Sequence, residues 1–269
     1  IPAHKQRLES GKLRALFSSR HLDEFEELMR RAQEDFASIP RRRENRPLVG
    51  VVGEFYVRLH DGANQDIIRK LESEGVETWL APMTEFFAYS NYISKMLSAD
   101  RLRDCGFSAG ELKEFASRWT NARLAARDEH TLFHATLPYL DGYEDIGSAE
   151  VITKGSKYID YNFGGEAICS MGKSEDFANR GLAGIVSVIP FNCMPGNCVA
   201  SLSQSLRRRH NNIPFLNLDY DGFIDSSREA KIVSFVWQVK ERYLGQPTAG
   251  VDDGIDDYEY STAGDSIDD

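Results

Sequence analysis

Two cysteines, Cys193 and Cys198, lie five positions apart in the stretch IVSVIPFNCMPGNCVASLSQSL, residues 185–206. Thiols in such a pattern can bind a metal ion or an iron–sulfur cluster, pair as a disulfide, or pack as small apolar groups. Cys193 follows an apolar run, and Pro195 suits the first turn of a helix. We therefore expect its sulfur beside the unpaired amides of a helix N-terminus, where the helix dipole favours a thiolate. Cys198 falls about one turn further on, where we expect a packing residue.

The four cysteines of the chain, at positions 105, 169, 193 and 198, are too few and too scattered for a disulfide scaffold. The N-terminal residues show no apolar signal-peptide segment, and no run reaches the roughly 18–20 apolar residues needed to cross a bilayer. We therefore expect a cytoplasmic protein without membrane contact. The chain opens without methionine and in helical character, so we expect it to be one piece of a longer polypeptide.

Two further patterns resemble a phosphate-binding loop and a metal site, but each lacks a part that such a site needs. The stretch AICSMGKS, residues 167–174, fits a loose phosphate-binding loop with alanine in the first position. Such a loop needs a preceding strand and a glycine-rich turn, and neither is evident here. His130 and His134 could share a helix face and bind a metal ion, but no third ligand is evident and Glu129 precedes the pair. We expect a surface or packing pair of histidines.

The formal charge of −10 is concentrated at the C-terminus, because the last nineteen residues carry eight carboxylates and no lysine or arginine. A segment of this composition cannot bury enough apolar surface to fold alone, so we expect an acidic tail over 246–269. The arginine triplets at 41–43 and 207–209 are expected to be solvated loops or helix ends. Nothing in this pattern suggests a surface that follows nucleic-acid phosphates.

Apolar periodicity predicts an α/β fold in four parts: a helical arm over 1–45, a first α/β unit over 46–145, a second over 146–245, and the acidic tail. We expect two flavodoxin-like or Rossmann-like parallel-sheet units joined by a helical segment. The predicted strands are Leu48–Val52, 76–82, 182–192 and 212–222, and the predicted helices include 21–39, 64–75, 195–211 and 226–244, with 83–137 almost wholly helical apart from a break near Gly106–Gly110. Functional groups of parallel sheets gather at the carboxyl ends of strands. Asn192–Cys198 is predicted at one such end, and Asp219–Gly222 at its neighbour.

Several segments together resemble the 2-hydroxyacyl-CoA dehydratase superfamily over roughly residues 46–243. They are GEFYVR with NQDIIRKLESEGVETWLAPMTEF, then GGEAICSMGK, IVSVIPFNCMPGN, and IPFLNLDYDG with REAKIVSFV. More closely, the chain is similar to the C-terminal part of the large acyl-CoA dehydratase activase-related proteins, the CoA-substrate-specific enzyme activases. The resemblance implies paired flavodoxin-like domains that hold a [4Fe-4S] or double-cubane cluster. It also implies an ATP-hydrolysing activase that injects a low-potential electron, after which the dehydratase eliminates water through a ketyl radical.

Carried over by position, the resemblance assigns Cys193 as a cluster ligand. It also assigns a cofactor-binding wall of the active cleft, made of the loop after the first strand and the Asn of the following helix: Gly53, Glu54, Tyr56, Arg58 and Asn64. The position of Cys169 is usually aliphatic in this family, so its thiol is expected in the core. The upstream ligand cysteines and the ATPase domain of longer relatives have no counterpart in this sequence.

The expected function is therefore that of an iron–sulfur component in an ATP-dependent electron-transfer system acting on CoA thioesters. Its expected partners are an upstream activase or cluster domain, or a separate ATPase subunit, together with acyl-CoA. Two alternatives remain open: a scaffold or docking domain of the same fold without a cluster, and a flavodoxin-like domain that binds a nucleotide or CoA in its cleft.

Overall fold

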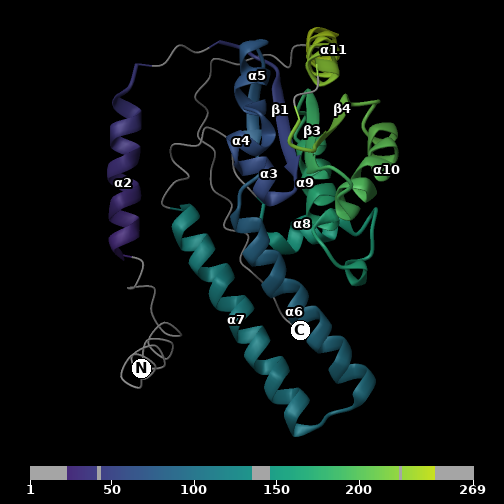
Figure 1. The fold of residues 1–269 in the computed structure, drawn as a ribbon. Helices are drawn as coiled ribbons and strands as arrows, with labels where there is room; N and C mark the ends of the chain where they lie inside the picture. The colour runs from purple at the N-terminus through teal and green to yellow at the C-terminus, as the bar shows by residue number, and fades with distance from the viewer. Residues whose placement is uncertain (1–22, 41–43, 135–145, 224–225, 246–269) are drawn as a thin grey trace.

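The computed structural model describes residues 23–40, 44–134, 146–223 and 226–245 (Figure 1). The helices are α2 (Asp23–Ser38), α3 (Phe55–Leu59), α4 (Asp61–Asn64), α5 (Ile67–Ser73), α6 (Thr84–Cys105), α7 (Ala109–His134), α8 (Ser148–Gly155), the 3-10 turn η3 (Tyr161–Phe163), α9 (Ala167–Asn179), α10 (Met194–Arg209) and α11 (Ser226–Gly245). The strands are β1 (Leu48–Gly53), β2 (Glu77–Leu80), β3 (Gly184–Pro190) and β4 (Phe215–Tyr220). The predicted acidic tail over 246–269 lies outside the described residues, as does much of the predicted N-terminal arm.

The strands form a parallel sheet in the order β2-β1-β3-β4, which confirms the α/β class. The sequence predicted two separate sheet units, whereas β1 of the first half pairs directly with β3 of the second, with Val51 beside Val186. Within the described parts of the chain, both halves therefore contribute strands to one sheet. The physical reason is that β1 and β3 are apolar and buried on both faces, so each needs a hydrogen-bonded neighbour on either edge and helices on either side.

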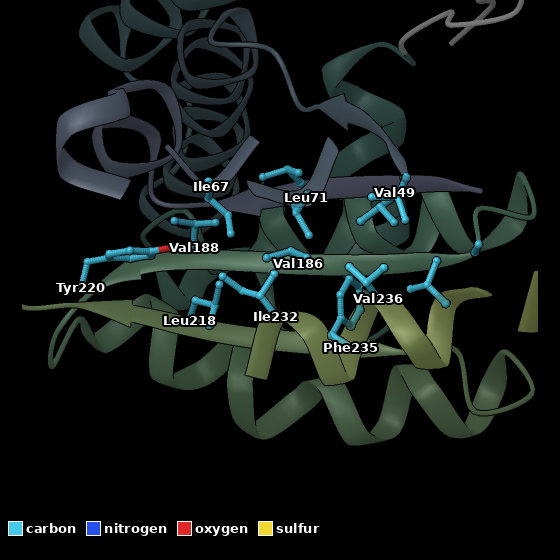
Figure 2. Close-up of a cluster of buried hydrophobic side chains, with 14 of the residues drawn as sticks. Val49, Ile67, Leu71, Val186, Val188, Leu218, Tyr220, Ile232, Phe235 and Val236 are labelled. Atoms are coloured by element: carbon cyan, nitrogen blue, oxygen red, sulfur yellow. The ribbon is translucent and has the colours of Figure 1, made fainter. Parts of the chain in front are cut away.

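One face of the sheet is covered by α5 and α11 (Figure 2). Alternate residues of the central strands point to this face, as the period of two in a strand requires. Val49 and Val186 meet Leu71 of α5 and Phe235 of α11 in one buried cluster. The apolar residues that led us to predict helices over 64–75 and 226–244 are therefore those that face the sheet.

The opposite face is covered by α9 and α10. Helix α9 approaches β1 closely because Gly50 has no side chain: a Cβ there would lie 2.2 Å from the Phe177 ring. A second close approach joins α9 to α8, since a Cβ on Gly172 would lie 1.9 Å from the carbonyl oxygen of Val151. Residues 167–174 therefore belong to a buried helix and do not form a glycine-rich loop.

Helices α6 and α7 form an antiparallel pair that extends away from the sheet (Figure 1). The break between them runs from Gly106 to Ser108, at the place where the sequence predicted one. The pair is anchored to the α/β body through α8 and a small cluster that includes Tyr89, Ile152 and Cys169. None of the described helices is both long enough and apolar enough to span a membrane.

Candidate functional site

The strand order places a switch in chain direction between β1 and β3, because the chain leaves β1 toward β2 on one side and later returns to build β3 and β4 on the other. Ligands of open parallel sheets bind outside the carboxyl ends of the strands at such a point. Here the end of β1 presents Gly53 and Glu54, and the end of β3 leads into Cys193. The two ends are directly connected, since the Glu54 amide donates a hydrogen bond of 3.0 Å to the Val188 carbonyl oxygen.

Cys193 is the N-cap residue of α10, as the sequence predicted. Its backbone is extended (φ −69°, ψ 121°), its amide donates to the Pro190 oxygen at 3.2 Å, and its own oxygen accepts from the Asn197 amide at 2.9 Å. The side chain makes no capping hydrogen bond, and the residue is half-buried. Asn192 just before it has a φ of +59°, so the chain turns sharply and sets the thiol at the start of the helix.

The other described thiols point elsewhere. Cys198 packs against the core beneath α10 and lies 4.0 Å, sulfur to sulfur, from Met194. Cys169 is 2% exposed on α9, in the cluster that anchors α6 and α8. Burial raises the pKa of the Cys169 thiol, and the nearby Glu85 carboxylate raises it further. Both placements confirm the prediction that these two cysteines are packing residues.

Two adjoining hollows open at the carboxyl edge of the sheet and share Glu54 and Glu166. The first is a narrow crevice between the end of β1 and the first turn of α10, lined by Gly53, Ser170, Ile189, Pro195 and Gly196 among others. The second is an open hollow of about 530 Å³, lined by Phe55, Tyr56, Leu59, His60, Met83 and Phe86 besides the two carboxylates. The narrow crevice beside the first turn of α10 thus adjoins a wider hollow with a largely apolar wall.

The two shared carboxylates differ in their surroundings. Glu54 caps α3 and accepts a hydrogen bond of 2.8 Å from the Val57 amide. Glu166 precedes α9 and makes no capping hydrogen bond there. Burial raises the pKa of Glu166, and repulsion from the Glu54 carboxylate raises it further, with Arg58 acting in the opposite sense. Burial and the neighbouring carboxylate therefore both disfavour the ionised form of Glu166.

Arg58, which the sequence assigned to the cleft wall, lies beneath that wall instead. Its side chain is 1% exposed, and its guanidinium lies 3.7 Å from Glu85, donates to the Pro82 oxygen at 3.2 Å, and stands 4.8 Å from the centre of the Phe55 ring. Burial lowers the pKa of Arg58, and the Glu85 carboxylate partly offsets this. Arg58 thereby packs against the buried side of the hollow's aromatic wall, in contact with Phe55.

Asn64, the second residue assigned to the wall, is also buried, with 1% exposure. Its amide donates to the oxygens of Val57 at 2.8 Å and Arg58 at 3.1 Å, and its side-chain oxygen accepts from the Ile67 amide at 3.3 Å. These bonds join α3, α4 and α5. Of the six residues predicted from the sequence, Gly53, Glu54 and Tyr56 line the hollows, Cys193 stands at the neighbouring helix start, and Arg58 and Asn64 support them.

The sequence did not single out Glu166, Met83 or Phe86 as site residues. Glu166 reaches the crevice because the preceding Gly164 and Gly165 both have positive φ, 75° and 77°, and a Cβ on Gly165 would lie 3.4 Å from Pro195. The consecutive glycines before Glu166 were the available signal. Phe86 lines the open hollow from α6. Helical periodicity alone does not indicate which exposed aromatic residue borders a cavity.

Among the side chains that the structure describes, no group of three or more His, Cys, Asp or Glu residues is arranged to hold a metal ion. Among the described thiols, Cys193 caps α10 at the carboxyl edge, Cys169 is buried, and the half-buried Cys198 packs against the core beneath α10. The described donors therefore do not fit a complete four-thiolate cluster site. They fit one thiolate ligand, Cys193, at the start of a helix, where negative charge is favoured. His130 lies on α7, and the side chain of His134 is outside the described part.

No family model, curated protein or solved structure matches the chain.

Proposed function

We propose that this chain is a component of a low-potential, ATP-dependent electron-transfer system related to the 2-hydroxyacyl-CoA dehydratases, acting on CoA thioesters in the cytoplasm. In this proposal Cys193 supplies one ligand to an iron–sulfur cluster whose remaining ligands come from a partner domain or subunit. The observation that carries it is the position of Cys193. This residue caps the N-terminus of α10 at the carboxyl edge of the sheet, beside the switch between β1 and β3 and near the two hollows that Glu54 and Glu166 line.

Three features support the proposal. The thiol is half-buried and makes no capping hydrogen bond. The helix start favours an anionic ligand or thiolate. Gly53 and Glu54 line the crevice that borders Pro195 and Gly196 in the first turn of α10, and Tyr56 lines the adjoining hollow. A cluster bound there would supply a low-potential electron to a bound thioester.

The proposal also includes a partner of similar fold. The superfamily pairs two flavodoxin-like domains, and we propose that this single sheet corresponds to one of them. The opposing domain would cover the carboxyl edge and contribute the missing thiolates. The upstream activase or a separate ATPase subunit would be the electron donor.

A scaffold or docking domain without a cluster is the second candidate, because two of the three described thiols, Cys169 and Cys198, pack against buried clusters. The two candidates differ in what anaerobic purification of the natural assembly would give. The first predicts a brown complex with iron and acid-labile sulfide, and acyl-CoA dehydration or reduction that depends on ATP. A colourless complex without iron after anaerobic reconstitution would overturn the proposal and favour the scaffold.

A further inference from the structure

The open hollow beside Glu166 has an unusually apolar wall for a surface feature. Four of its side chains are large, apolar and well exposed: Tyr56 at 63%, Leu59 at 39%, Met83 at 41% and Phe86 at 39%. Apolar groups gathered around one hollow of about 530 Å³ are typical of a binding site rather than of ordinary surface. We call these four residues, with the buried Phe55 behind them, the apolar shelf.

The shelf is an ordered surface. The rings of Phe55 and Phe86 meet edge to face with centroids 5.1 Å apart, and Tyr56 stacks on His60 at 5.0 Å. The buried Arg58 guanidinium lies under the Phe55 ring at 4.8 Å. Because these rings support one another across α3 and α6, the hollow is largely formed before anything binds, which reduces the entropic cost of binding.

Two carboxylates line the hollow, and its lining contains no lysine or arginine, although the buried Arg58 lies behind it. Glu54 and Glu166 are close enough for repulsion to raise the pKa of Glu166. The opposite end of the hollow is apolar, so a charged group of either sign at the end of an acyl chain would lose its hydration there without gaining a partner, which is unfavourable. A neutral O–H or N–H group of a ligand can instead donate a hydrogen bond to the carboxylates at the polar end.

From these observations we infer that the hollow is the acyl subsite of the chain, and that it selects an apolar, uncharged acyl group over one that ends in a carboxylate. The acyl chain lies on the apolar shelf, and the thioester end lies at Glu54 and Glu166, toward the crevice bordered by Pro195 and Gly196 of α10. This inference rests on the proposed function for the thioester class of the ligand. It adds the chemical class of the acyl group.

The test uses three thioesters of N-acetylcysteamine with chains of equal length: hexanoyl, adipoyl and ε-aminohexanoyl. They end in a methyl group, a carboxylate and an ammonium group. Each is titrated into the full-length chain by calorimetry, and ¹³C-methyl methionine spectra locate the site. Met83 lies in the shelf, whereas Met171 is fully buried and serves as an internal control.

We expect hexanoyl to bind at least about tenfold more tightly than adipoyl or ε-aminohexanoyl, and to shift the Met83 methyl signal but not that of Met171. Phe86→Ala should weaken hexanoyl binding about tenfold, whereas Phe107→Ala, at an 84% exposed aromatic residue between α6 and α7, should not. Tyr56→Ser, at a 63% exposed position, provides a second variant that leaves the buried packing in place.

Equal or tighter binding of adipoyl, tighter binding of the amine, or hexanoyl binding without a Met83 shift would each overturn the inference. These outcomes are separate from those that test the proposed function, because the titration needs no iron. A chain that binds hexanoyl in the shelf while Cys193 proves irrelevant to iron binding would contradict the proposed function alone. A chain that needs Cys193 for iron binding but does not bind hexanoyl in the shelf would contradict this inference alone.

Discussion

Arg58 and Glu85 form an ion pair that is almost completely removed from water: Nη1 of Arg58 lies 3.7 Å from Oε2 of Glu85, and the side chains are 1% and 6% exposed. The pair joins α3, which follows the central strand β1, to α6, which begins the extended helical pair. It therefore ties the wall of the candidate site to the first turn of α6, where the helical pair leaves the sheet.

Removal of one member of this pair is expected to leave a buried charge without its counter-ion. We predict that Arg58→Met lowers the free energy of unfolding by about 3–5 kcal/mol. The double variant Arg58→Met with Glu85→Leu should recover much of that loss, because no uncompensated charge remains. Urea denaturation measures both. Arg69→Ala, which removes an 80% exposed arginine paired with Asp66, is the control and should cost less than about 1 kcal/mol. A double variant as unstable as the single one would contradict this explanation.

Gly172 is predicted to be essential for packing rather than for phosphate binding. A methyl group there would lie 1.9 Å from the Val151 oxygen of α8, so Gly172→Ala should destabilise the protein by about 1–3 kcal/mol or more. Gly110→Ala, in α7 with its nearest neighbour atom at 3.8 Å, should be neutral or stabilising, since alanine favours helix. Thermal unfolding compares the two. Equal melting temperatures would show that α8 and α9 do not pack as described.

The Glu175 carboxylate should contribute to stability in a defined acidic window. Burial alone would raise its pKa, but hydrogen bonds from Lys157, Tyr158 and His210 outweigh this and lower it from 4.5 to about 2. Because the folded-state pKa is lowered, this stabilisation is complete above pH 4.5 and is lost as the pH falls toward about 2.

Unfolding measured across that window should therefore show a steeper loss of stability in the wild type than in Glu175→Gln. The exposed-carboxylate variant Glu229→Gln serves as the control and should follow the wild-type curve. Parallel curves for wild type and Glu175→Gln would mean that the carboxylate is not held by these three donors.

The described thiols should differ sharply in reactivity toward an alkylating reagent. Cys193 is half-buried at a helix start, whereas Cys169 is 2% exposed and burial raises its thiol pKa. We predict that brief labelling with N-ethylmaleimide modifies Cys193 well before Cys169, which should react only after unfolding. Mass spectrometry of the peptides gives both rates. Comparable labelling of the two in the folded protein would contradict the placement of α9.

Local sequence patterns predicted most of the elements, but not how they combine. The apolar run Leu48–Val52 and the proline at position 195 marked a buried strand and a helix start, and both are present. Which strand lies beside β1 depends on contacts between distant segments, so the single sheet could not be read from local periodicity. Arg58 shows the same limit: an arginine in a loop after a strand is usually exposed, and its burial depends on Glu85, twenty-seven positions later.

The weak resemblance of residues 167–174 to a phosphate-binding loop has a physical explanation. A glycine is needed at position 172 because α8 packs too closely there for any side chain. Lys173 is fully buried, with its ammonium 3.5 Å from Asp176. Asp176 is also bound by Lys154 at 2.8 Å and Arg180 at 3.1 Å. The glycine and lysine therefore serve helix packing and charge neutralisation, requirements that a short pattern cannot distinguish from phosphate binding.

The most direct test of the central claim is the iron and acid-labile sulfide content of the anaerobically purified natural assembly, with wild type compared against Cys193→Ser and Cys198→Ser. The proposal predicts that Cys193→Ser loses iron and sulfide or changes the electron paramagnetic resonance spectrum of the reduced cluster. Cys198→Ser should match the wild type, because its side chain packs inward. Iron and sulfide content and spectra that are identical in all three proteins, or a wild-type assembly without iron, would contradict it.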